Sequence, residues 1–180
     1  MRLYKLTDQN DQTQGQTRWG ENITHSAVGE DNKLCTSGVI HAYTHPFLAM
    51  LFNCIQGKFD EDTCHMWESE GEPVAGDGTK KGCKTLTTLK RIEVPKVTIE
   101  QRVRFAILSV LEVYHVEEFK VWAINWLSGK NRSAEAAKAA WAAGAAAEAA
   151  VRATWTVSVV GAIAQNLDLA LLADRAMEVK

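Results

Sequence analysis

The stretch LCTSGVIHAYTHPFLAMLFN, residues 34–53, decides how the rest of the chain is interpreted. It begins with a Thr-Ser-Gly turn signal, and the β-prone run 39–43 follows. Pro46 suits the first turn of a helix, where a missing N–H group costs nothing, and Thr44 or His45 can cap that helix. Apolar residues then recur at helical spacing. The stretch therefore predicts a short strand that leads directly into a helix with one buried face.

The composition limits the class of protein. The chain has 180 residues and is 46% hydrophobic, which is enough for one domain, or one small domain with a helical extension. A net charge of −2 argues against nucleic acid as a partner. The N-terminus does not resemble a signal peptide, and the most apolar segment, 155–173, contains Gln165, Asn166 and Asp168. We therefore expect a cytoplasmic protein with no membrane partner and with reduced cysteines.

The pattern changes near Pro95. Strands are predicted over residues 1–7, 65–68 and 84–94, with a glycine- and charge-rich turn over 71–82. Beyond Pro95, Thr98 and Gln101 fit a capping box, and helices are predicted over about 99–114, 116–128, an Ala-rich stretch after Ser133, and 167–177. The expected fold class is α+β, a small β-rich N-terminal half followed by an all-α, Ala-rich helical half. The expected domains are 1–95 and 96–180, the second with about four helices.

Several segments resemble one protein family. They are WGENITH (19–25), the stretch 34–53, MWE (66–68), KKGCKTLTTLKRI (80–92) and, further on, RFAILSVLEVY, VWAINWLSG and NRSAEAAKAAWAA. Together they are similar to a family of uncharacterised proteins found in phages and bacteria, and the resemblance covers most of the chain. It implies a phage-related origin, and hence the host cytoplasm for a phage-encoded protein, but it implies no activity.

A second resemblance concerns the segment SGVIHAYTHPFLAMLFN, residues 37–53. It is similar to the strand–helix segment of ADP-ribosyltransferases, in which a glycine-led strand meets a helix beside the NAD pocket. Glu68-Ser69-Glu70 is similar to the spaced glutamate pair of one branch of these enzymes. That branch has an arginine on its first strand, where this chain has Lys5 after Tyr4. The other branch has a histidine on an early strand, a position for which only His25 is available here.

The candidate catalytic residues follow from chemistry and from this resemblance. They are His25, His41, Tyr43, Glu68 and Glu70. His41 and Tyr43 are two residues apart, so on a strand they share a face and can contact one ligand. A histidine with a carboxylate partner is the usual acid–base pair. The alternative is structural, with each histidine and the tyrosine satisfied by local hydrogen bonds, and residue types alone favour that alternative.

Cysteine and histidine also raise the question of a metal site. The candidates are Cys35, His41, His45, Cys64 and His65, with Cys54 and Cys83 further away. Zinc binds thiolates and imidazoles, but these spacings match no compact zinc module. The alternative is that the cysteines are small buried apolar residues. We expect no metal and no cofactor.

Two functions remain open from the sequence. The first is a phage-associated accessory protein that binds a host or phage protein, with the helical half as its interaction or homo-oligomerisation element. The second is an ADP-ribosyltransferase-like, NAD-binding domain, either active or degenerate. The second function requires residues 19–25, 41–43 and 68–70 to converge on one cleft.

Overall fold

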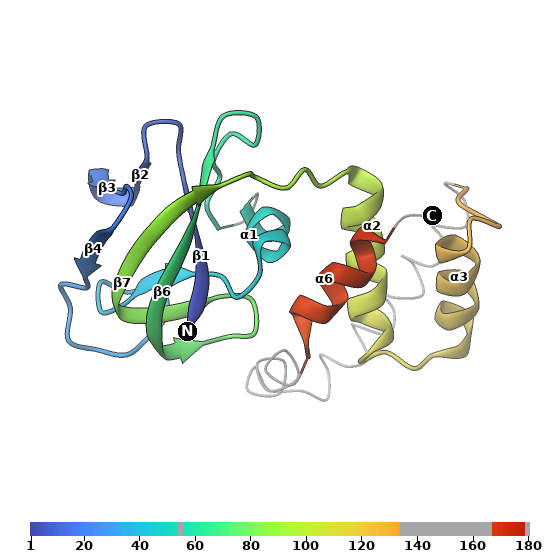
Figure 1. Ribbon diagram of the computed structural model, residues 1–180. Coiled ribbons are helices and arrows are strands. Elements are labelled where there is room, and N and C mark those ends of the chain that lie inside the picture. The colour runs from blue at the N-terminus through green and yellow to red at the C-terminus, as the bar shows by residue number, and fades with distance from the viewer. Residues whose placement is uncertain (54–55, 134–166, 179–180) are drawn as a thin grey trace.

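The computed structural model describes residues 1–53, 56–133 and 167–178, which form an antiparallel sheet and the helices packed beside it (Figure 1). The strands are β1 (Arg2–Thr7), β2 (Gln12–Thr13), β3 (Thr17–Arg18), β4 (Ile23–Ser26), β5 (Ile40–Ala42), β6 (His65–Gly76) and β7 (Lys81–Ile92). The helices are η1 (Gln14–Gln16, a 3₁₀ turn), α1 (Pro46–Asn53), α2 (Ile99–Leu111), α3 (Glu117–Leu127) and α6 (Leu169–Met177).

The main sheet curls until its ends meet. Its strand order is β1-β6-β7-β4, and β5 pairs with β7 beyond β4. A single bridge then joins β5 back to β1, because Tyr4 and Tyr43 exchange both backbone hydrogen bonds, at 2.8 and 2.9 Å. Each strand of the ring β1–β6–β7–β5 therefore has a neighbour on both sides, at least over part of its length. Closure of this kind removes exposed strand edges.

The two faces of the sheet have different surroundings. Residues directly opposite each other in the register point to the same side, so Leu6, Met66 and Ile92 lie on one face and Lys5, Trp67 and Arg91 on the other. The first face packs on α1 and forms the larger core. Segment 8–26 lies over the second face, where Trp19 forms a smaller core with Leu3, Ala42, Cys83 and Leu86. The cleft described below lies where β5 meets β1 and is lined by residues of both faces.

The helix starts follow the capping signals in the sequence. His45 caps α1, since its Nδ1 accepts the backbone N–H of Phe47 at 3.3 Å and Pro46 occupies the first turn. Both halves of the capping box at α2 are formed, between the side chain of Thr98 and that of Gln101. These predictions are confirmed.

The expected fold class is wrong. The described chain is a mixed fold in which α1 lies among the strands, and one short helix, α6, is described at the C-terminus instead of an all-α half. The physical reason is a shared core. Leu169, Leu172 and Ala173 of α6 pack in the same cluster as α1 and the sheet, and α1 lies between them (Figure 1). Helical periodicity predicts each helix, but it does not show that the last one returns to the sheet.

The division near residue 95 stays a prediction. Residues 93–98 join β7 to α2 without regular structure. The predicted Ala-rich helix falls on residues 134–166, and Cys54 is likewise outside the described residues. None of the described helices has the length and apolar character needed to cross a lipid bilayer.

Candidate functional site

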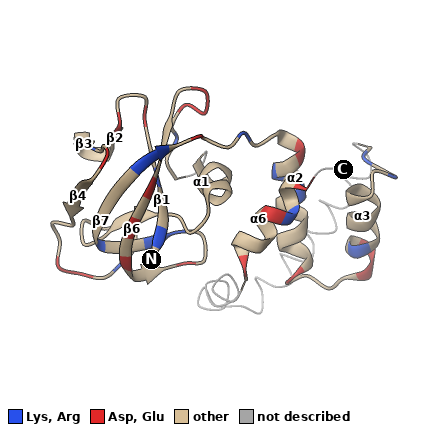
Figure 2. Cartoon of the chain, viewed as in Figure 1, with Lys and Arg blue, Asp and Glu red and all other residues tan. Residues whose placement is uncertain are grey.

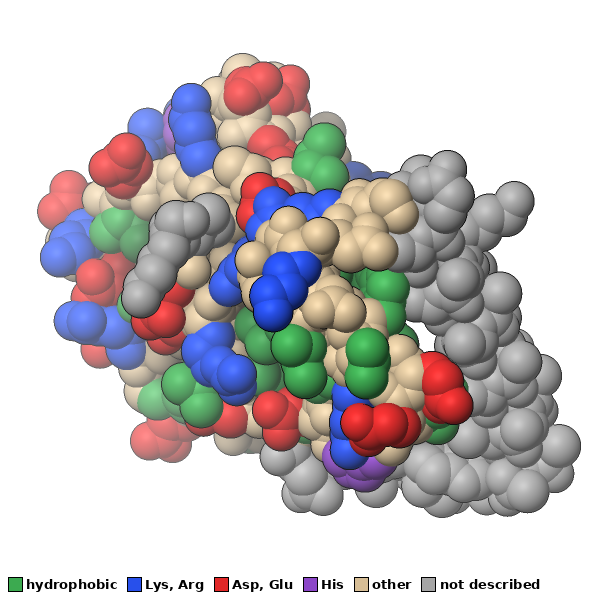
Figure 3. All heavy atoms as spheres, turned by 90° about the vertical axis from the view of Figure 1, so that its right-hand side faces the viewer, with side chains coloured by type: hydrophobic (Ala, Val, Ile, Leu, Met, Phe, Trp, Pro, Cys, Tyr) green, Lys and Arg blue, Asp and Glu red, His purple; other side chains and the backbone are tan. Residues whose placement is uncertain are grey.

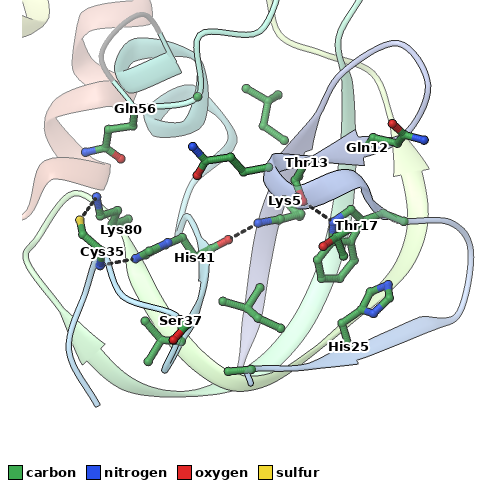
Figure 4. A pocket seen from close by; sticks show the side chains of 18 of the residues that line it. Lys5, Gln12, Thr13, Thr17, His25, Cys35, Ser37, His41, Gln56 and Lys80 are labelled. Carbon is green, nitrogen blue, oxygen red and sulfur yellow. Dashed lines mark hydrogen bonds between the residues drawn. The ribbon is translucent and has the colours of Figure 1, made fainter. Parts of the chain in front are cut away.

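A broad cleft lies where the N-terminal loops meet β1 and β5 (Figure 4). Its volume is about 1410 Å³, larger than the roughly 300–1,000 Å³ of most small-molecule sites, and it is open to solvent. The residues whose chemistry matters here are Lys5, Trp19, His25, Cys35, His41, Tyr43, Gln56, Lys58 and Lys80. They come from five separate parts of the sequence, which the closed sheet brings together.

Lys5 lies at the centre of the cleft floor (Figure 4). Its Nζ donates to the backbone carbonyl of His41 at 2.8 Å and lies 5.2 Å from the centre of the Trp19 ring. No carboxylate of the described residues forms an ion pair with it. Burial of the amine lowers the pKa of Lys5 from 10.5 to about 8, and the negative charge that Cys83 carries as a thiolate offsets only part of this shift. Lys5 is therefore a weakly compensated cation facing a ligand-sized space.

Trp19 forms one wall of the cleft and is itself held rigidly. Its indole Nε1 donates to Thr13 Oγ1 at 2.9 Å, and the His25 ring meets it edge-on with centroids 4.7 Å apart. His25 Nε2 also lies 2.8 Å from the carbonyl oxygen of Arg18. His25 thus lines the cleft as predicted, but these contacts are those of a residue that positions Trp19.

His41, Cys35 and Lys80 form a hydrogen-bonded group at one rim (Figure 4). The backbone N–H of Cys35 donates to His41 Nε2 at 2.9 Å, and Lys80 Nζ donates to Cys35 Sγ at 3.4 Å. Burial, with the positive charges of Lys80 and Lys5, lowers the pKa of His41 to about 4. His41 is therefore neutral at pH 7. Because Nε2 accepts a hydrogen bond here, Nδ1 carries the ring hydrogen and is the donor that His41 can offer a ligand.

Tyr43 lies on the same side of β5 as His41, as their spacing predicts, and it also lines the cleft. Its hydroxyl donates to Gln56 Oε1 at 2.9 Å, and Gln56 Nε2 in turn donates to Thr79 Oγ1 at 3.3 Å. Burial raises the pKa of Tyr43 to about 12, and the charge of Asp77 adds to this. The tyrosine therefore stays protonated at any ordinary pH.

Segment 27–39 forms the outer rim, and two residues of β7 hold it in place. A Cβ on Gly82 would lie 2.8 Å from Val39 Cγ2, so glycine is needed for the rim to pack against β7. The Lys84 ammonium donates to the carbonyl oxygens of Gly29, Glu30 and Asp31, at 3.2, 2.9 and 2.6 Å. The rim is therefore tied to the sheet beside Cys35 and His41.

The charge of the cleft is opposite in sign to that of the whole chain. Three lysines line it, Lys5, Lys58 and Lys80, against a single carboxylate, Asp8, while the chain carries −2 overall. The Asp8 carboxylate already accepts the backbone N–H groups of Asn10 and Gln12. None of the three lysines forms an ion pair within the described residues. A positive cleft in an acidic protein concentrates field lines and favours an anionic ligand.

The predicted glutamates do not join this cleft. Glu68 is bound by Arg2 at 3.0 Å and by Lys90 at 3.5 Å, and Glu70 lines a separate hollow beside Met1. Figure 2 shows acidic residues of β6 beside basic residues of β7, which is the setting of Glu68 opposite Lys90. The structure thus brings together two of the three expected segments, 19–25 and 41–43, and leaves out 68–70.

The candidate metal ligands are dispersed. His45 Nε2 contacts Asp174 Oδ1 at 3.2 Å, His65 Nδ1 contacts Asp11 Oδ1 at 2.8 Å, and Cys64 is buried near the Glu61 carbonyl. Among the candidates that the structure describes, only Cys35 and His41 are joined by a hydrogen bond. Within the described residues no three metal-binding side chains gather at one point, and Cys35, Cys64 and Cys83 are free thiols.

Sequence reasoning missed Lys5, Trp19 and Lys80 as site residues. One signal was present for Lys5, because it falls on the same face of the predicted first strand as Leu3. A lysine on a buried face calls for a partner or a function. Trp19 lies in segment 19–25, which the NAD-binding hypothesis places at the cleft, and Lys80 belongs to a basic run that can contact phosphate or simply face solvent. Their exact places depend on contacts far apart in the sequence.

Comparisons with protein families, curated proteins and solved structures give no match for this chain. The resemblances described above therefore stay predictions.

Proposed function

We propose that the protein is a ligand-binding domain whose cleft takes an organic anion bearing a flat ring, a nucleotide in particular. The observation that carries the proposal is the set of three cleft lysines without ion-pair partners in the described part of the chain. Lysine amines bind phosphate as point charges. Trp19 and Tyr43, only 4% and 8% exposed, shape the wall of the cleft, and His41 Nδ1 offers a donor to the ring of a ligand.

The size of the cleft favours an elongated ligand. About 1410 Å³ exceeds what a mononucleotide fills and accommodates a dinucleotide such as NAD. This agrees with the NAD-binding function expected from the strand–helix resemblance. Because Glu68 and Glu70 point elsewhere, the proposal is limited to binding and includes no glutamate-dependent transfer reaction.

Thermal melting with NAD, ADP and inorganic phosphate tests this function. A ligand at a hundred times its Kd stabilises the folded state by about 2.7 kcal/mol, which raises Tm by a few degrees. We expect a shift with the nucleotides that weakens as salt rises. Lys80→Gln should reduce the shift, whereas Lys96→Gln, at an exposed lysine outside the cleft, should leave it unchanged. The absence of a shift with all three anions would overturn the proposal.

Partner binding through the helices is a second proposed function. Val121 and Ile124 are three residues apart on α3 and are 51% and 60% exposed, on the side away from buried Ala123. Figure 3 shows hydrophobic side chains among charged ones on the face turned toward the viewer. Exposed apolar side chains that lie side by side are available for contact with another protein, and this feature supports an accessory protein that binds a host or phage protein.

A double substitution, Val121→Glu with Ile124→Glu, tests this second function. We expect the variant to keep its melting temperature but to lose a partner recovered from host lysate with the wild type, or to lose self-association in light scattering. If the wild type recovers no partner and is monomeric, the second function is wrong, and the cleft proposal is unaffected.

A further inference from the structure

We propose that Lys5 is a covalent capture site, whose amine forms an imine with an anionic aldehyde or ketone bound in the cleft. This inference rests on the proposed function, since the same cleft must first bind the anion. It adds the chemical class of the ligand, namely a carbonyl compound that carries a phosphate or carboxylate group.

The placement of the amine is the first argument. Lys5 rises from β1 into the cleft, fixed by one carbonyl acceptor on β5 and by the Trp19 ring (Figure 4). An ammonium has three hydrogens, and the described residues supply one acceptor for them at 2.8 Å. The nitrogen is thus positioned toward the space in which a ligand lies, and no carboxylate holds it in the charged form.

The groups that face Lys5 do not restore its charge. The Cys83 thiol on β7 is neutral, because burial raises its pKa, and His41 on β5 is neutral above a pKa of about 4. With the pKa of Lys5 lowered to about 8, roughly a tenth of the amine is unprotonated at pH 7. That fraction is about 300-fold larger than for a lysine at 10.5. Only the neutral amine has the lone pair that attacks a carbonyl carbon.

The reaction balances without an oxidant or a reductant. The Lys5 nitrogen attacks the carbonyl carbon and a C–N bond forms, giving a carbinolamine. The nitrogen loses both of its hydrogens, directly or through solvent, to the former carbonyl oxygen. That oxygen leaves as water, and a C=N bond remains. Lys80 at the rim supplies a charge for the anionic group of the same ligand.

Reductive trapping tests the inference. The full-length protein is incubated at pH 7 with pyridoxal 5′-phosphate and, separately, with pyridoxal, then reduced with cyanoborohydride and mapped by peptide mass spectrometry. Lower basicity also lowers nucleophilicity, so part of the 300-fold gain is lost. We expect Lys5 to be trapped about tenfold faster than the exposed Lys96 in the same molecule.

Three further readouts separate a specific site from general labelling. The rate at Lys5 should rise with a midpoint near pH 8. Lys5→Arg, which keeps the charge but forms no imine, should lose the rapid labelling while keeping its melting temperature. Lys80→Gln should slow trapping of the phosphorylated aldehyde more than that of pyridoxal.

Equal labelling of Lys5 and Lys96, or labelling at Lys5 without any preference for the phosphorylated probe, would overturn the inference. The proposed function is judged independently, because NAD and ADP contain no free carbonyl group that forms an imine. If these nucleotides raise Tm but Lys5 is not trapped, the capture site falls and the binding function stands. If they do not raise Tm, the binding function falls.

Discussion

Lys5 and Arg91 lie in the same cross-strand row of the sheet, with Trp67 between them, yet their surroundings differ. Arg91 donates to Asp11 at 2.6 Å and lies over the Trp67 ring, 5.1 Å from its centre. Lys5 lies at a similar distance from Trp19 but has a backbone carbonyl in place of a carboxylate. Each of these two cations on one face thus contacts a tryptophan ring, but only Arg91 has a carboxylate as its counter-ion.

The difference separates structure from function. Asp11 ties the loop after β1 to β6 and β7, since its carboxylate also accepts from His65 and Trp67. The Asp11 carboxylate and the Arg91 guanidinium therefore neutralise each other, and their hydrogen bonds are made within the protein. Lys5 lacks such a match, and a buried cation without a counter-ion lowers stability. Weakly compensated charges of this kind are typical of sites that bind or react.

Breaking the matched group should have the largest effect. Asp11→Asn removes the negative charge that faces Arg91. Whichever way the new amide is oriented, its NH₂ group points at a donor, either Arg91 or His65. We expect a loss of about 2 kcal/mol in the free energy of unfolding, at the low end for a charged hydrogen-bond network because Arg91 is 47% exposed. Urea unfolding measures it. Glu30→Gln, at an exposed carboxylate, is the control, and an equal effect in both would contradict the comparison.

Removing the unmatched cation should act in the opposite direction. Lys5→Met deletes a desolvated ammonium and keeps most of its packing volume. Removing the buried charge should raise the free energy of unfolding by roughly 2–3 kcal/mol. Losing the hydrogen bond and the ring contact should lower it by about 1–2 kcal/mol. We therefore expect the variant to be about 1 kcal/mol more stable at pH 7, while Lys96→Met is unchanged. A destabilised Lys5→Met would show that Lys5 serves the fold and not a ligand.

The same difference should depend on pH. The folded pKa of Lys5 lies near 8 and the unfolded value near 10.5. The cost of burying the charge is therefore present in full below pH 8 and fades as pH rises toward 10.5, because the unfolded chain then binds more protons. The stability gap between Lys5→Met and the wild type should shrink from pH 7 to pH 10. Tyr43 and Cys64 are present in both proteins, so their titrations cancel in this difference, whereas Cys83 titrates differently once the charge of Lys5 is removed. A constant gap would argue against a shifted Lys5.

The smallest effect concerns the rim. Lys84→Met removes the ammonium that bridges three carbonyl oxygens of segment 29–31. These carbonyls are close to solvent, so we expect at most about 1 kcal/mol in global stability. Hydrogen exchange over residues 27–39 should nevertheless increase, and nucleotide binding should weaken through the displaced Cys35 and His41. Unchanged exchange would show that the rim is held by Gly82 and its neighbours alone.

Local signals in the sequence predicted local structure well. The first strand, α1 with its proline start, and the capping box at Thr98 are all where the pattern places them. The turn expected over 71–82 is instead partly strand, because β6 runs to Gly76 and accommodates Pro73 at irregularities in its register. The extent of β6 is set by its pairing with β7, and the sequence of the 71–82 segment alone does not predict this pairing.

The candidate site could likewise be predicted only where its residues are close together in the sequence. Spacing placed His41 and Tyr43 together, and both line the cleft. The glutamate pair was chosen by resemblance, but Glu68 pairs with Arg2 and Lys90 instead, and Glu70 lines a separate hollow. Lys5 became visible only when the chain closed β5 onto β1, since its carbonyl partner lies 36 residues away.

The ring closure has a consequence for synthesis on the ribosome. β1 emerges first, yet Tyr4 pairs with Tyr43 on one side and with Glu68 on the other. Until both later strands have left the exit tunnel, the segment RLYKLT is an apolar, β-prone strand with two bare edges, a form prone to aggregate. Its charges alternate across the two faces, Arg2 on one and Lys5 on the other. In the nascent chain these two residues act as gatekeepers that keep the strand from pairing with the wrong partner.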